Sequence, residues 1–260
     1  MIPAGDPAFN NLVRPKDSSV ASSGEQAFFL NGGDTRGNPI GGMLQLDMAS
    51  KSFRNTTSPF DQLWSGKMQF VPSYGQDGLL VNIGGASGTQ DDGDIGWRSV
   101  QVYDVSNQVW YNQTTSGDFP EPRKEHCVEG LASSEQTYEI FVYGGSDGYY
   151  GADTKKYDTI HILSLPSFHW SQVSYPPEAP RNGHTCHAVG GSQILVVGGI
   201  NPSLKETKEF TNMMQFRDDF PQGLSVFDMN ALTWSNKYSA SVPAYHQSKI
   251  IKDCYAPNGK

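Results

Sequence analysis

An acidic loop is the first place in this sequence where side chains could bind a ligand. Asp91, Asp92 and Asp94 bring three carboxylates into four residues, and carboxylates are the hard oxygen ligands that Ca²⁺ prefers. The rest of an EF-hand pattern is missing around them. The loop is therefore a candidate for weak calcium binding, with a solvated acidic turn as the alternative.

A second loop combines aromatic and acidic side chains. It holds Asp147, Tyr149, Tyr150 and Asp153, and tyrosine rings beside carboxylates suit stacking against a sugar or a metabolite. The alternative is ordinary surface filling, because such residues are common on any protein surface. Both loops therefore contribute candidate ligand-binding residues.

The sequence predicts no catalytic centre. It contains no G-x-S-x-G elbow, no HExxH helix and no P-loop. His187, beside Cys186, falls outside the repeats described below and is the histidine that we would test as a stray ligand or base, with a structural role as the alternative. We expect no catalytic residue, no cofactor and no metal, and we favour a protein that is not an enzyme.

Three cysteines leave an odd count. Cys127, Cys186 and Cys254 show no metal-ligand spacing. A disulfide between Cys127 and Cys186 is conceivable, but the two occupy nonidentical positions in neighbouring repeats, and Cα atoms more than about 7 Å apart cannot be bridged. We therefore expect buried free thiols.

The elements that position these loops repeat along the chain. Four short apolar segments each run into a pair of glycines, at intervals of 52, 60 and 54 residues. A glycine pair allows positive φ and close backbone approach where a strand leaves its sheet. The pairs are Gly32 and Gly33, Gly84 and Gly85, Gly144 and Gly145, and Gly198 and Gly199.

A second strand and a large aromatic residue follow each glycine pair. The predicted strands cover residues 44–48, 100–105, 160–165 and 224–229, and each carries one short polar residue. An aromatic stands six residues after that polar residue in every repeat, whereas the loop before the strand varies in length. We expect the aromatics to pack between adjacent repeats. They are Phe53, Trp110, Trp170 and Trp234.

A Pro-Arg-x-x-His motif precedes two of the glycine pairs. It places Arg123 and His126 in one repeat and Arg181 and His184 in the next. We interpret these side chains as structural, since they satisfy hydrogen bonds within and between repeats. In the repeat that leads to Gly84 the motif is absent.

Composition and charge narrow the function. The chain has 260 residues, 28 glycines, 16 prolines and a formal net charge of −8, with its lysines and arginines scattered. This is a turn-rich globular protein without a basic face, so we do not expect nucleic acid binding.

The sequence gives mixed indications of location. The N-terminal residues lack the pattern of a signal peptide, and no segment approaches the roughly 18 apolar residues of a membrane helix, so we expect no membrane insertion by this chain. Asn55 and Asn112, however, begin N-glycosylation sequons at the same place in two repeats.

Together, the glycine pairs, the fixed spacing to the aromatic and the Pro-Arg-x-x-His motif resemble the kelch repeat, over nearly the whole chain. Several stretches are similar to fungal secreted or membrane-anchored kelch ectodomains, in particular their C-terminal portion. The resemblance implies an extracellular or cell-surface location, together with earlier blades and a membrane anchor. These stretches are residues 110–114, 139–145, 161–170, 222–229 and 244–255.

We therefore predict an all-β fold, a kelch-type β-propeller with about four recognisable four-stranded blades. Residues 1–260 form one partial domain, to which residues 1–26 and 238–260 contribute further strands or closing segments. Four recognisable blades leave two alternatives, a closed ring or an incomplete or open one with unpaired edges. The predicted function is non-catalytic recognition of a protein or a cell-surface glycan. The alternative is a small-molecule enzyme or isomerase of fungal secondary metabolism with a pocket on the propeller axis.

Overall fold

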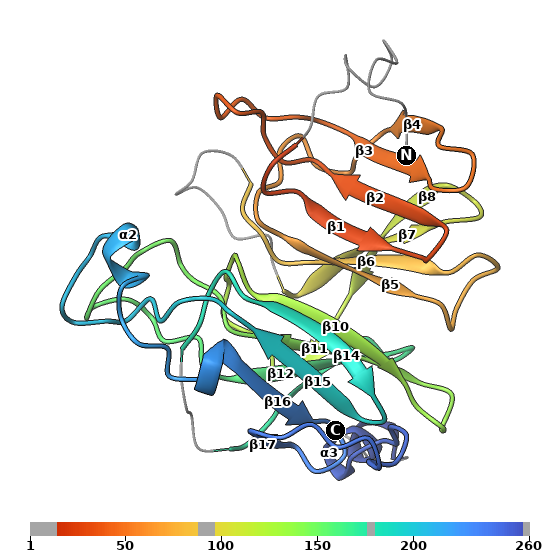
Figure 1. The fold of residues 1–260 in the computed structure, drawn as a ribbon. Helices are drawn as coiled ribbons and strands as arrows, with labels where there is room; N and C mark the ends of the chain where they lie inside the picture. The colour runs from red at the N-terminus through yellow and green to blue at the C-terminus, as the bar shows by residue number, and fades with distance from the viewer. Residues whose placement is uncertain (1–14, 88–96, 176–179, 257–260) are drawn as a thin grey trace. The chain divides into compact units, whose positions relative to one another are not determined.

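The computed structural model describes residues 15–87, 97–175 and 180–256. It contains four sheets, each built on four antiparallel strands that lie in the order in which they follow one another along the chain (Figure 1). The all-β prediction of four four-stranded kelch-type blades is confirmed. No helix in the described ranges is long and apolar enough to cross a membrane.

Each blade is a meander of four strands. A two-residue strand, β9 (Ser116–Gly117), adds to the outer edge of the third blade by pairing parallel with β13. Blade 1 comprises β1 (Ser19–Ser22), β2 (Gln26–Leu30), β3 (Met43–Asp47) and β4 (Phe53–Thr56). Blade 2 comprises β5 (Lys67–Val71), β6 (Leu79–Ile83), β7 (Ser99–Asp104) and β8 (Val109–Thr114). Blade 3 comprises β10 (Cys127–Ala132), β11 (Tyr138–Tyr143), β12 (Ile160–Leu165) and β13 (His169–Gln172). Blade 4 comprises β14 (Thr185–Gly190), β15 (Gln193–Val197), β16 (Leu224–Asp228) and β17 (Thr233–Ser235).

The glycine pair after the second strand allows one blade to approach the next. Gly144 and Gly145 have φ values of 68° and 113°, which favour glycine. The Gly145 amide donates a hydrogen bond to the Arg181 carbonyl of blade 4 at 2.7 Å. A Cβ at Gly144 would collide with that carbonyl and with the ring of His184. The pair is therefore required by the contact between blades.

In blade 1 the left-handed pair lies one residue earlier than the glycine doublet. Asn31 and Gly32 have φ values of 50° and 99°, and Gly33 forms the bridge to Lys16 that Ser146 forms to Lys124 in blade 3. Asparagine tolerates this conformation better than most residues. The predicted pair of Gly32 and Gly33 is thus shifted, with Asn31 in the first position.

The fixed spacing to the aromatic comes from the turn between the third and fourth strands. The Asp228 carboxylate accepts hydrogen bonds from the backbone amides of Asn230 and Ala231 at 2.8 and 3.2 Å. The closed turn sets the register that pairs Phe227 with Trp234. Because the turn has one length, the aromatic falls at one spacing.

By internal contacts the chain divides into two units. The first unit comprises Met1–Ile95 and Gln101–Tyr111, and the second comprises Gly96–Val100 and Asn112–Lys260. In the first unit, Phe28 and Leu30 of blade 1 share a core with Met68 and Leu80 of blade 2. Blades therefore pack face to face, and alternate residues of a strand face opposite neighbours.

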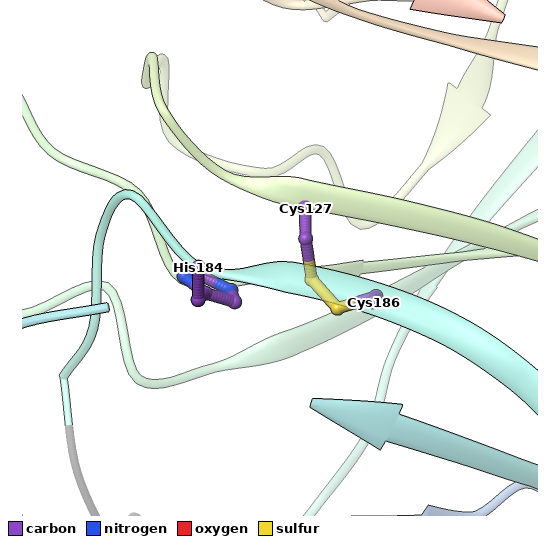
Figure 2. A group of neighbouring side chains, drawn as sticks. All are labelled: Cys127, His184 and Cys186. Carbon is purple, nitrogen blue, oxygen red and sulfur yellow. A yellow bond between two sulfur atoms is a disulfide. The ribbon is translucent and has the colours of Figure 1, made fainter. Parts of the chain in front are cut away.

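The prediction of free thiols is wrong for Cys127 and Cys186, which form a disulfide with a Cα–Cα distance of 5.7 Å (Figure 2). The bridge Lys124–Ser146 of blade 3 corresponds to the bridge Asn182–Ile200 of blade 4. In this alignment of the two blades, Cys127 stands one position before the residue that corresponds to Cys186. One blade buries one face on the opposite face of the next. Positions offset by one residue therefore face each other, and the argument from nonidentical positions was wrong.

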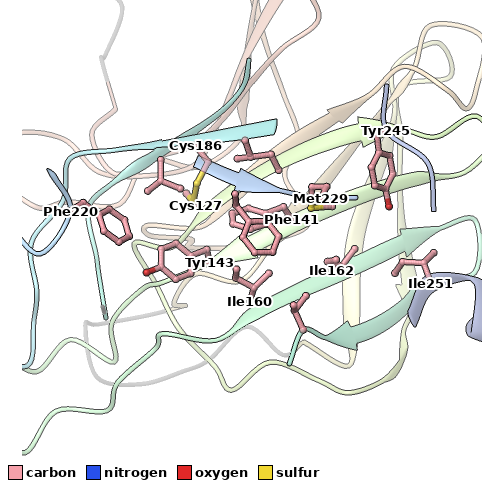
Figure 3. Packing of buried hydrophobic residues seen from close by; sticks show 14 residues of the cluster. Cys127, Phe141, Tyr143, Ile160, Ile162, Cys186, Phe220, Met229, Tyr245 and Ile251 are labelled. Atoms are coloured by element: carbon pink, nitrogen blue, oxygen red, sulfur yellow. A yellow bond between two sulfur atoms is a disulfide. The ribbon is translucent and has the colours of Figure 1, made fainter. Parts of the chain in front are cut away.

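The core of the second unit lies between blades 3 and 4 (Figure 3). Phe141 and Ile162 from blade 3 meet Ile194 and Phe227 from blade 4, and the disulfide lies within the same cluster. Phe141 and Phe227 have ring centroids 5.4 Å apart. All four side chains are fully buried, which stabilises each by about 1.5–3 kcal/mol relative to exposure.

The two terminal segments behave differently. In the described part of residues 1–26, the strand β1 opens blade 1. Residues 238–256 contribute no strand and instead run into the helix α3 (Lys249–Tyr255). Gln247 donates to Thr137 Oγ1 at 2.9 Å, and the Tyr255 hydroxyl lies 2.9 Å from Ser164 Oγ. This segment is thus a tail that covers part of blade 3.

The tail buries a carboxyl group. Glu139 is fully buried, and its Oε1 accepts hydrogen bonds from Thr137 and Ser164 at 2.6 and 2.9 Å. Desolvation raises the pKa of this carboxyl, while hydrogen bonds from Thr137, Ser164 and Tyr245 oppose the rise. A folded-state pKa above the unfolded value contributes stability at low pH that is lost as the pH rises through the folded pKa.

Replacing Glu139 with glutamine should therefore stabilise the chain at neutral pH. We expect Glu139→Gln to raise the free energy of unfolding at pH 7.5 by on the order of 1 kcal/mol, and the gain should shrink towards pH 4. Urea unfolding at both pH values measures it. The control is Glu135→Gln, since Glu135 is partly exposed near Lys252. A gain at pH 4 as large as at pH 7.5 would contradict the explanation.

Candidate functional site

Two long loops of the second unit lie against each other. Residues 146–159 connect β11 to β12, and residues 200–223 connect β15 to β16. The Gly151 amide donates to the Pro202 carbonyl at 2.8 Å. Lys208 Nζ lies 3.5 Å from the Asp153 carboxylate. We call these two segments the paired-loop surface.

The first of these loops presents Tyr149 to solvent. The Asp147 carboxylate accepts hydrogen bonds from the Tyr149 amide at 3.1 Å and from Thr154 Oγ1 at 3.0 Å. These bonds close the loop on itself, so Asp147 shapes the turn. Tyr149 is 65% exposed at its tip. Of the predicted ligand-binding residues here, Tyr149 is therefore the most accessible aromatic.

Tyr150 instead lies close to Glu125 and Asn182, which come just before β10 and β14. Its hydroxyl is half-buried, and burial together with the negative charge of Glu125 raises its pKa, although a hydrogen bond with Asn182 opposes this. Asn182 Nδ2 also donates to Glu125 Oε2 at 2.7 Å. Of the two predicted tyrosines, Tyr149 is therefore exposed to solvent, whereas Tyr150 is partly buried against the blades. Asp153 stays exposed beside Lys208.

The second loop is anchored to the repeat motif. Arg181 is buried, and its Nη1 donates to Asp218 Oδ2 at 3.0 Å, while Nη2 pairs with the other carboxylate oxygen. The guanidinium lies 3.9 Å from the centroid of the Phe220 ring. Although desolvation raises it, the hydrogen bonds and charge of Arg181 hold the pKa of Asp218 below its ordinary value. The end of the loop is therefore fixed.

Arg123, the equivalent arginine of blade 3, is held by neutral groups. Its Nε donates to the Glu121 carbonyl at 2.9 Å and its Nη1 to the Gly144 carbonyl at 3.2 Å. Its guanidinium lies 4.5 Å from the Tyr157 ring. Burial lowers the pKa of Arg123 to about 10, which leaves it cationic at neutral pH. In blade 2, the bridge Trp64–Ala86 corresponds to the bridge Lys124–Ser146 of blade 3, so Leu63 occupies the position of Arg123.

The repeat histidines and aromatics lie in the packed interior or along the outer strands. His126 packs on Trp97, with ring centroids 5.2 Å apart, and the Trp170 indole donates to the Trp97 carbonyl at 3.0 Å. Trp234 lies edge-on to Tyr143 of blade 3, at 4.9 Å. Trp110 packs on Tyr103 of its own blade at 4.9 Å, and Phe53 is half-buried in β4.

The paired-loop surface also exposes apolar side chains. Met214 and Phe216 follow the short helix α2 (Phe210–Met213) and are 59% and 42% exposed. A turn of 3₁₀ helix (Pro221–Gly223) then leads into β16. Large exposed apolar side chains on anchored loops are typical of binding surfaces. Sequence reasoning missed these two residues because the charged run before them dominates the loop.

The other predicted candidates lie elsewhere. Asp91, Asp92 and Asp94 fall outside the described residues. His187 is exposed on β14, on the face opposite Cys186, since neighbouring residues of a strand point to opposite faces. Among the residues that the structure describes, the histidine beside the cysteines is His184.

Comparison with known proteins decides the family. A sequence profile described as the KLHDC2/KLHL20/DRC7 Kelch-repeats domain matches residues 71–251, more than half of the chain. The chain belongs to the kelch-repeat family. This kelch chain is similar to a kelch repeat-containing protein of the fungus Arthroderma benhamiae, with 29% identity over 219 residues that cover 81% of this chain and 29% of the relative.

The chain is also similar to proteins from animals and plants. The mouse Rab9 effector protein with kelch motifs is 27% identical over 178 residues, covering 67% of this chain and 40% of the relative. Acyl-CoA-binding domain-containing protein 5 of Arabidopsis thaliana is 27% identical over 138 residues, covering 51% and 20%. The kelch chain therefore spans less than half the length of each of these relatives.

Removing the anchor of the second loop should destabilise this unit. Asp218→Asn leaves the buried Arg181 guanidinium without its carboxylate, and we expect a loss of about 2–4 kcal/mol in the free energy of unfolding. Urea denaturation measures this loss. The matched control is Asp219→Asn, because Asp219 is exposed and accepts a hydrogen bond from the side chain of Asn201 on the same loop. Equal, small effects of both substitutions would show that the Arg181–Asp218 pair does not hold the loop.

Proposed function

We propose that this kelch chain recognises a protein partner through the paired-loop surface. The observation that carries the proposal is the exposure of Tyr149, Met214 and Phe216 on two loops that are fixed to each other and to the blades. Aromatic residues and methionine are enriched at the centres of protein interfaces. A rigid surface also loses little entropy on binding.

The relatives support a protein partner over a glycan. The mouse relative is named as an effector of Rab9, which describes binding between proteins in that molecule. Kelch blades act in general as interaction scaffolds, with variable loops on a constant frame. Recognition of a cell-surface glycan is the other outcome that a test must distinguish. The alternative of a small-molecule enzyme stays a prediction from the sequence.

Substitutions at the loop tips should abolish partner binding and leave the fold intact. We expect the double substitution Tyr149→Ala with Phe216→Ser to lose specific protein partners in quantitative affinity purification. Tyr238→Ala is the matched control, because Tyr238 is 56% exposed in the C-terminal tail, outside the two loops. Circular dichroism checks folding. Partners retained by the double variant, or glycan-array binding that depends on Tyr149, would overturn the proposal.

We also propose that the chain acts in an extracellular or cell-surface setting as a glycoprotein. The support is the resemblance of the sequence to fungal secreted or membrane-anchored kelch ectodomains, together with the exposure of both sequon asparagines, Asn55 on β4 and Asn112 on β8. Exposed sequons are accessible to glycosylation.

When the chain is produced with a secretion signal in a eukaryotic host, we expect two N-linked glycans. Removal of glycans with an endoglycosidase should lower the mass in two steps, and Asn55→Gln and Asn112→Gln should each remove one step. Secreted protein that carries no glycan at either site would contradict the proposal.

A further inference from the structure

Three side chains with metal-binding atoms gather between blades 3 and 4. They are Cys127, His184 and Cys186, and their ligand atoms all lie within 4.8 Å of one another (Figure 2). All three side chains are at least 95% buried. The repeat motif explains His184 and the disulfide explains the cysteines, but neither explains why the imidazole lies beside both sulfur atoms.

The convergence follows from the face-to-face packing. His184 and Cys186 are two residues apart, so both point to the same face of blade 4, towards blade 3. Cys127 begins β10, which runs beside β14, and it pairs with Tyr143, a member of the shared core. The Tyr143 ring lies edge-on to the His184 ring at a centroid distance of 5.3 Å. Packing therefore fixes the orientation of the imidazole.

The oxidation state decides what this cluster can bind. In the oxidised chain the two sulfur atoms share a covalent bond and are poor ligands. A dithiol reductant or glutathione cleaves that bond, so that two electrons and two protons convert the disulfide to two thiols and the reductant becomes a disulfide. Two thiolates and one neutral imidazole then form a soft ligand set.

We propose that the reduced chain binds one Zn²⁺ at Cys127, His184 and Cys186. Zinc takes two cysteines and one histidine together with a water molecule in known protein sites. Two thiolates neutralise the ion, so the complex carries no net charge, which suits a buried setting. Binding releases the two thiol protons. Because the ligands come from both blades, the ion replaces the disulfide as the link between them.

Zinc titration of the oxidised and reduced full chain tests this site. Both samples carry Cys254→Ser, which removes the thiol near Ser171 and leaves the proposed ligands intact. A chromogenic zinc chelator competes for the ion, and Co²⁺ reports thiolate ligation through its charge-transfer absorption. We expect one Zn²⁺ per reduced chain, a raised melting temperature, and no binding by the oxidised chain.

Ligand variants separate this site from adventitious binding. Cys127→Ser leaves one thiolate, so it should reduce the cobalt–thiolate band to that of a single thiolate, and His184→Gln should weaken Zn²⁺ binding at least about tenfold. If His184→Gln fails to fold, zinc X-ray absorption on the reduced Cys254→Ser chain decides, with two sulfur and one imidazole neighbour expected. No binding by the reduced chain, equal binding by the oxidised chain, or zinc without sulfur neighbours would overturn the proposal.

Discussion

Burial of one blade face on the opposite face of the next blade is the constraint from which the rest of the structure follows. Between blades 3 and 4 it joins Phe141 to Phe227 and Tyr143 to Trp234. Blades 1 and 2 repeat it with Leu30 and other apolar residues. Close approach requires left-handed backbone after the second strand, which explains why glycine or asparagine stands there. The repeated residues of the sequence are therefore the ones that this packing between blades requires.

The same constraint separates scaffold from function. The arginines, histidines and glycines of the repeat motifs make contacts inside the blades. For example, Arg123 and Arg181 donate hydrogen bonds to glycine carbonyls. The side chains to which we assign the proposed recognition lie on the connections between the second and third strands. There the Arg181–Asp218 pair links a scaffold residue to a variable loop. A kelch blade can thus change its loop while its interior stays constant.

The sequence predicted the strands well because their signals are local. A turn closed by Asp228, or a doublet such as Gly144 and Gly145, depends on neighbouring residues. What the sequence concealed depends on contacts between blades. The disulfide was missed because equivalence was judged along the chain, whereas facing residues are offset by one position. The burial of Glu139 by the tail is a long-range contact that no local pattern predicts, and Met214 and Phe216 carry no repeat signal at all.

Disulfide mapping tests the packing of blades 3 and 4 most directly. The chain would be equilibrated with oxidised glutathione, digested without reduction and analysed by mass spectrometry. The face-to-face register predicts a peptide linked through Cys127 and Cys186, with Cys254 as the free thiol. A bond between Cys254 and either of the other cysteines, or free thiols at both Cys127 and Cys186, would contradict that register and the account of the core built on it.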